Sequence, residues 1–132
     1  MPNVKMMIGS NLSIRVDGGF FSAKGGSDDG RIVFTAFDQA LPWQGISFLT
    51  DDVRNELDFV EVSYAGSDQL GNINAVANIG VGAFDRVSIT NTNVTNGLGY
   101  GISLDDSSEV NMDLETVNTI SGNALGTVFY DL

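Results

Sequence analysis

Residues 30–66 read GRIVFTAFDQALPWQGISFLTDDVRNELDFVEVSYAG, and the spacing of apolar residues in this stretch decides the fold. Ile32 and Phe34 are separated by one residue, as in a strand that buries one face. The same alternation returns 25 residues later at Leu57 and Phe59. A fixed period of 20–50 residues is the signature of a repeat architecture.

Three columns of residues continue this repeat through the chain. The first column is Met7, Ile32, Leu57, Val87 and Met112, the second is Leu12, Phe37, Val62, Thr92 and Val117, and the third is Phe21, Ile46, Ile79, Ile102 and Val128. Two residues after the members of the third column stand Ala23, Phe48, Val81, Leu104 and Tyr130. Short strands that turn at Gly, Asn or Asp corners would stack these residues inside a triangular prism.

The sequence therefore predicts an all-β fold, a right-handed parallel β-helix of about five rungs with three short strands per rung. Residues 1–132 form a single domain in this interpretation. A β-sandwich would not require every third strand to repeat. Helices would require apolar stripes with a period of 3.6 residues, which the sequence lacks.

Composition excludes several functions. The chain has 6 Lys and Arg residues against 17 Asp and Glu residues, a net charge of −11, which argues against nucleic acid as a partner. It contains no His and no Cys, so Ser-His-Asp triads, thiol catalysis and Cys-ligated zinc are excluded. No apolar run is long enough for a transmembrane helix.

Three segments carry a resemblance to a known group of proteins. Residues 30–36 (GRIVFTA), 43–48 (WQGISF) and 55–66 (NELDFVEVSYAG) resemble bacterial right-handed parallel β-helix repeat proteins of the pectin-lyase-like superfold. The resemblance implies the fold and an extracellular or bacterial cell-surface location. It also implies that this chain is a module of a longer secreted or surface protein. It implies no reaction, because a fold hosts many functions.

Acidic residues follow the third strand of several rungs. Asp51, Asp52, Asp105 and Asp106 are the candidate ligands for Ca²⁺, which binds six to eight oxygen atoms. The alternative is a solvated corner in which Arg31, Arg54 and Arg86 pair with the carboxylates. Both interpretations place an acidic ridge along one corner of the prism.

An insertion and two aromatic residues are the candidate ligand-binding elements. The step from Val62 to Ile79 is 17 residues, against 9 to 11 in the other rungs. Insertions in solenoids form loops on one face, which is often the binding face. The candidate ligand-binding residues are Trp43, Asp68, Gln69, Asn72 and Tyr100. The two aromatic rings could stack on sugars or pack at corners, and both alternatives stay open.

The leading hypothesis is a non-catalytic β-helix module of an exported bacterial protein that serves surface structure or binds a glycan or a surface protein. The alternative is a polysaccharide lyase or glycoside hydrolase, with Ca²⁺ as a candidate cofactor. Residues 126–132 still read as a strand without a polar cap. Because terminal rungs of a solenoid need covering, we expect end-to-end association of copies or flanking rungs in a longer chain.

Overall fold

The computed structural model describes residues 4–71 and 73–131. Three parallel sheets wind around one axis as a β-solenoid of about four turns. Sheet A contains β1 (Lys5–Ile8), β4 (Ile32–Ala36), β7 (Val60–Ser63), β10 (Asn93–Thr95) and β12 (Thr119–Ser121), in that order. Sheet B contains β2 (Ser13–Val16), β5 (Gly45–Phe48), β8 (Ala77–Val81), β11 (Tyr100–Leu104) and β13 (Gly126–Tyr130). Sheet C contains β3 (Ser22–Lys24), β6 (Glu56–Asp58) and β9 (Ser88–Thr90).

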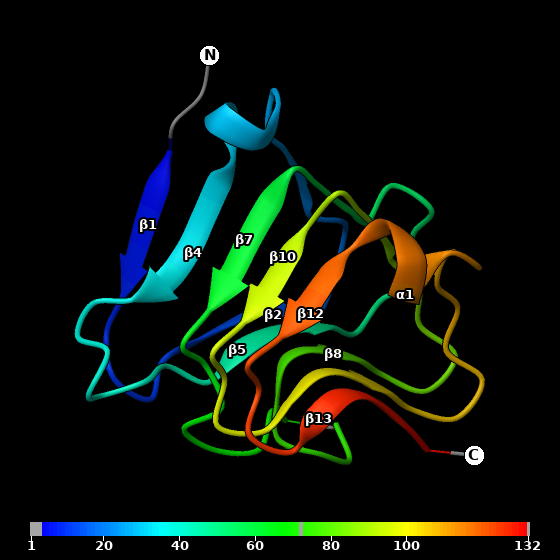
Figure 1. The fold of residues 1–132 in the computed structure, drawn as a ribbon. Helices are drawn as coiled ribbons and strands as arrows, with labels where there is room; N and C mark the ends of the chain where they lie inside the picture. Colours follow the sequence, from blue (N-terminus) through cyan, green and yellow to red (C-terminus); the bar gives the residue numbers. More distant parts are fainter. Residues whose placement is uncertain (1–3, 72, 132) are drawn as a thin grey trace.

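The first three rungs cross sheets A, B and C in turn. Figure 1 shows the rungs advancing from β1 to β12 in a right-handed coil, the usual hand for connections between parallel strands. A short 3₁₀ turn, η1 (Asp28–Gly30), lies between the first two rungs. In the fourth rung α1 (Leu114–Val117) follows β11 where a strand of sheet C would lie. The described part of the fifth rung consists of β12 and β13, so the coil has about four turns rather than five complete rungs.

The predicted third column is largely confirmed by the register of sheet B. Its stacked members are Ile46, Ile79, Ile102 and Val128. The first member was predicted wrongly, because Ile14 and not Phe21 pairs with Ile46. The Phe21 ring instead packs near the corner, with its centroid 5.9 Å from that of Phe34.

The first predicted column is wrong, because it mixes sheets A and C. Ile32 pairs with Val60 in sheet A, whereas Leu57 pairs with Ala23 and Ile89 in sheet C. Its last member, Met112, is fully exposed beyond the strands. Ile32 and its partner Val60 are 28 residues apart, so the predicted step of 25 residues from Ile32 ends in sheet C and not in sheet A.

The second predicted column is also wrong except for Val62. This residue stacks between Phe34 and Val94 in sheet A. Leu12 and Phe37 were predicted inside, but both are exposed in the connections after β1 and β4. A connection bends away from the prism axis, so alternation in its sequence does not imply burial.

The core is a stack of inward side chains from all three sheets. The largest fully buried side chains include Trp43, Ile46, Phe48, Leu57, Ile79, Ile89 and Ile102. Parallel strands buried on their inner face in this way are typical of solenoids, where each rung covers the next.

One asparagine closes the corner between sheets A and B. The Asn78 side chain is fully buried, and its Oδ1 atom accepts a hydrogen bond from the Ala65 amide at 3.2 Å. Its Nδ2 atom donates to the Thr95 carbonyl at 3.1 Å and to Oδ1 of Asn123 at 3.2 Å. Asn123 Oδ1 also accepts the Gly97 amide at 2.9 Å. These amides satisfy corner backbone groups of two successive rungs, the third and the fourth.

We expect Asn78→Ala to lower the free energy of unfolding by about 1–3 kcal/mol, because buried backbone groups lose their partner. Urea unfolding followed by circular dichroism measures this change. Gln39→Ala, which truncates an exposed side chain in the connection after β4, is the control and should shift the free energy by less than about 0.5 kcal/mol. Equal stability of both variants and the wild type would contradict the role of the corner amide.

Candidate functional site

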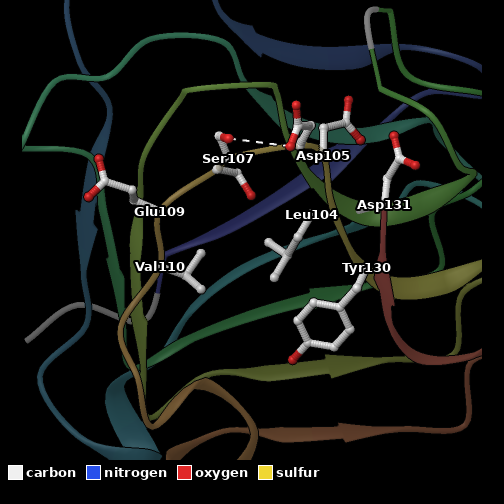
Figure 2. Close-up of a pocket in the computed structure, with 9 residues that line it drawn as sticks. Leu104, Asp105, Ser107, Glu109, Val110, Tyr130 and Asp131 are labelled. Atoms are coloured by element: carbon white, nitrogen blue, oxygen red, sulfur yellow. Dashed lines mark hydrogen bonds between the residues drawn. The ribbon is translucent and has the colours of Figure 1, made fainter.

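A pocket of about 360 Å³ lies where β11 and β13 of sheet B end, between the fourth and fifth rungs. Its lining residues are Leu104, Asp105, Asp106, Ser107, Ser108, Glu109, Val110, Tyr130 and Asp131. Figure 2 shows the side chains of Leu104, Val110 and Tyr130 on one side, and the carboxylates of Asp105 and Asp131 together on the other. We call this cavity the acidic end pocket.

The pairing of β11 with β13 places two of these carboxylates side by side. Leu104 pairs with Tyr130, and the ladder continues one residue further because the Asp131 amide donates to the Leu104 carbonyl at 2.9 Å. The Asp105 amide donates to Val81 in the same way at 3.0 Å. Asp105 and Asp131 therefore project from equivalent positions on neighbouring strands, about 4.8 Å apart.

Burial and like charge act on this pair. The side chain of Asp105 is only 6% exposed, and this burial raises its pKa. The negative charge of Asp131 raises it further, although a hydrogen bond from the Asn74 amide at 3.2 Å opposes the shift. The pocket therefore carries a concentration of negative charge that is costly for the folded chain.

The predicted acidic ridge continues from the pocket along the same corner. Burial raises the pKa of Asp85, and the charges of Asp51, Asp105 and Asp17 raise it further. Carboxylates of successive rungs thus lie close enough to repel one another. This agrees with the ridge predicted from the acidic residues that follow the strands in the sequence.

Arginines pair with part of this corner, as in the salt-bridge interpretation. Arg54 binds Asp52 at 2.8 Å, and this guanidinium lowers the pKa of Asp52 to about 2. Arg86 binds Glu109 at 2.7 Å. Both pairs are exposed, so each contributes little to stability by itself.

The four candidate Ca²⁺ ligands do not converge. Asp105 and Asp106 reach the acidic end pocket, whereas Asp51 is exposed on the ridge and Asp52 is engaged by Arg54. Within residues 4–71 and 73–131, no group of three or more acidic, His or Cys side chains is arranged to hold a metal ion.

The two candidate sugar-stacking aromatics are packed into the fold. Trp43 is completely buried, and its Nε1 atom donates to the Ser63 carbonyl at 2.8 Å. Tyr100 is half-buried, with its ring centroid 5.1 Å from that of Phe129. This geometry corresponds to corner packing and leaves the Trp43 ring no free face for a ligand.

The insertion folds back onto the outer face of sheet B. Leu70 and Ile73 are buried there, and a methyl group at Gly80 would lie 2.8 Å from the Ile73 side chain. Of its candidate ligand-binding residues, Asp68 and Gln69 are exposed. Asn72 lies outside the described residues.

The insertion also meets the acidic end pocket, a contact that the sequence does not indicate. The Asn74 side-chain amide donates to Asp131, and the Asn74 backbone amide donates to Asp105. Asn74 thus joins the insertion to both stacked carboxylates.

Tyr130 lies in the pocket although it was not among the predicted site residues. Its hydroxyl donates to Glu115 at 2.5 Å, and this bond raises the pKa of Tyr130 to about 12. The phenol therefore stays protonated at neutral pH. The only signal in the sequence was the place of Tyr130 at the end of an apolar column.

Comparisons with known proteins add no family to these observations. No protein-family model, curated protein or solved structure matches the chain. Among the helices in the described part of the chain, none has the length and hydrophobicity to cross a membrane.

The pKa shifts of Asp105 and Asp52 predict opposite effects of removing each charge. Ionised Asp105 destabilises the folded state because its pKa is raised, so this cost is present at neutral pH and disappears as pH falls below the unfolded value of about 3.9. Asp105→Asn keeps an acceptor for Asn74 and should therefore raise the urea midpoint at pH 7, with a smaller gain near pH 3.

Asp52→Asn is the control, and its expected change in the urea midpoint at pH 7 has the opposite sign. Its lowered pKa stabilises the folded state above about pH 4, and this contribution is lost as pH falls towards 2. The variant should have a lower urea midpoint than the wild type at pH 7, and the two midpoints should converge in acid. If Asp52→Asn raised the urea midpoint at pH 7, or Asp105→Asn lowered it, the signs predicted from the two pKa shifts would be wrong.

Proposed function

We propose that the chain is a non-catalytic β-helix module of an exported bacterial protein, and that it contributes to surface structure by binding protein at the acidic end pocket. The observation that carries this proposal is the make-up of the pocket. Its apolar side is formed by Leu104 and Val110 of the fourth rung and Tyr130 of the fifth, and two of its carboxylates, Asp105 and Asp131, follow the ends of β11 and β13.

A strand edge beside apolar side chains is suited to another polypeptide. β13 lies at the end of sheet B and β12 at the end of sheet A, so each has one edge available for a further strand. Added strands gain affinity from main-chain hydrogen bonds and specificity from alternate side-chain pockets. The carboxylates of Asp105 and Asp131 favour a cationic partner.

The packing of the aromatic residues favours protein over glycan. The two aromatic residues predicted to stack on sugar rings are engaged within the fold, because Trp43 is buried and Tyr100 packs against Phe129. The remaining polar residues of the insertion, Asp68 and Gln69, bond within the insertion itself, at 2.8 Å to each other and at 2.6 Å to Ile73.

The chemistry of the pocket also favours binding over polysaccharide cleavage. Residues 105–131 contain six acidic residues and no Lys or Arg, so this part of the chain supplies no basic residue for a lyase reaction. Tyr130 is held as a hydrogen-bond donor to Glu115 and does not serve as a base at neutral pH. The proposed location outside the cell rests on the resemblance to secreted β-helix repeat proteins.

The test incubates the purified chain with polygalacturonate and with neutral glucans, with and without millimolar Ca²⁺. We expect neither unsaturated products nor new reducing ends, because residues 105–131 supply no basic residue for a lyase reaction and Asp105 is buried and bonded to the Asn74 amide. A polygalacturonate lyase is the positive control for both assays. Product formation that Asp105→Asn and Asp106→Asn abolish would overturn the proposal and support the enzyme alternative.

A further inference from the structure

We propose that Phe84, in the turn between β8 and β9, anchors a basic segment of a partner protein in which an apolar residue stands between Lys or Arg residues. In this inference the Phe84 ring contacts the apolar residue, and carboxylates of the same corner contact the cations. The inference rests on the protein-binding part of the proposed function. It extends the binding surface from the acidic end pocket along the corner between sheets B and C.

The first observation is that Phe84 is held in a strained backbone conformation. Its φ is 64°, in the left-handed region that Gly and Asn adopt readily and that bulky residues avoid. The equivalent residue of the next rung, Ser107, has a φ of 59°, and the Phe84 amide donates to the Asp106 carbonyl at 3.1 Å. The turn therefore imposes the conformation, and Asn or Gly would adopt it at a lower cost in free energy.

Two other aromatic residues share this strain but are packed against the fold. The φ angles of Phe59 and Tyr64 are 50° and 57°. The guanidinium of Arg31 lies 5.8 Å from the centroid of the Phe59 ring, and Tyr64 packs against the core. Phe84 is 68% exposed, so its side chain gains little from folding. A strained residue whose side chain does not support the fold indicates a role in binding.

The second observation is an excess of carboxylates in the turns that follow the first four strands of sheet B. These turns are residues 17–20, 49–54, 82–86 and 105–109, and we call them the acidic turns. They hold seven Asp or Glu residues and two Arg residues. Both arginines are already engaged, Arg54 by Asp52 and Arg86 by Glu109.

The carboxylate next to Phe84 is among those without a cation. A methyl group at Gly82 would lie 2.5 Å from Oδ2 of Asp85, so the Asp85 side chain covers Gly82. Asp105 occupies the position equivalent to Gly82 in the next rung, which places the two carboxylates on one surface. Among the described residues, no ion pair includes Asp51, Asp85 or Asp105. Cations of a partner would relieve their repulsion.

A second pocket, of about 260 Å³, borders the acidic turns on the side of sheet C. Val53, Val87 and Val110 contribute apolar surface to it, and Val53 is 72% exposed. Arg86, two residues after Phe84, also lines it. The corner thus combines exposed apolar side chains with carboxylates that lack cations. This combination matches a segment that carries both apolar and basic residues.

The test titrates two fluorescently labelled synthetic peptides, KKLKKLKK and KKSKKSKK, with the purified chain and records their anisotropy. The two peptides carry the same charge and differ only in their apolar residues. We expect the wild type to bind KKLKKLKK about tenfold more tightly, because only its Leu side chains bury surface against Phe84. Added salt should weaken the binding of both peptides.

Phe84→Asn should bind the two peptides with equal affinity, because it removes the ring and keeps every charge. Phe37→Asn is the matched control. Phe37 is 69% exposed and lies between β4 and β5, outside the acidic turns. The control should keep the tenfold preference for KKLKKLKK.

Urea unfolding gives a second readout that separates binding from folding. Asn adopts the left-handed conformation more readily than Phe, so Phe84→Asn should raise the urea midpoint. Phe37→Asn should not raise it, because Phe37 is not among the residues with positive φ. A variant that is more stable and yet binds more weakly has lost the contact and not the fold.

A wild type that binds neither peptide or does not distinguish them would overturn the inference, as would a Phe84→Asn variant that keeps the preference. Sedimentation velocity of the chain alone tests the other occupant. Self-association that Phe84→Asn abolishes would assign this surface to a second copy and overturn the basic partner.

Asp131→Asn separates this inference from the proposed function, because Asp131 lines the acidic end pocket and lies outside the acidic turns. Binding of KKLKKLKK that depends on Asp131 and not on Phe84 would overturn the anchor and leave the proposed function in place. Cleavage in the polysaccharide assay would instead overturn the non-catalytic function without changing these titrations.

Discussion

Every rung must place its inward side chains directly over those of the rung before, and this stacking constraint governs the rest of the molecule. Main-chain pairing between rungs enforces it within the sheets. At the corners Asn78 enforces it, because one amide satisfies backbone groups that would otherwise be buried without partners. Connections outside the sheets are free to vary in length, and the insertion before β8 is the largest use of that freedom.

The same freedom limits what sequence alone can predict. The stack of Ile46, Ile79, Ile102 and Val128 was recoverable because these residues lie in strands of one sheet with strong alternation. Ile32 and Leu57 were assigned to one column although they belong to different sheets. The error arose because strands of sheets A and C show the same alternation of apolar residues, so alternation alone does not tell which sheet a strand belongs to. Fold class thus follows from local pattern, but register depends on long-range pairing.

The candidate site shows the same division. Asp105 and Asp106 could be predicted because acidic residues recur where strands of sheet B end. Asp131 joins them only through the pairing of β11 with β13, which no local pattern contains. Trp43 shows the converse, since a ring beside an apolar column is compatible with both exposure and burial until the Ser63 carbonyl is seen to bind its indole.

The insertion on sheet B has a consequence for the form of any assembly. Ser47 and Ser103 face outwards from this sheet, yet both are buried, and Ile73 packs over Gly80 between them. This flank of the solenoid is therefore covered by its own chain. Any assembly that uses this flank is built on the insertion and not on the strands of sheet B.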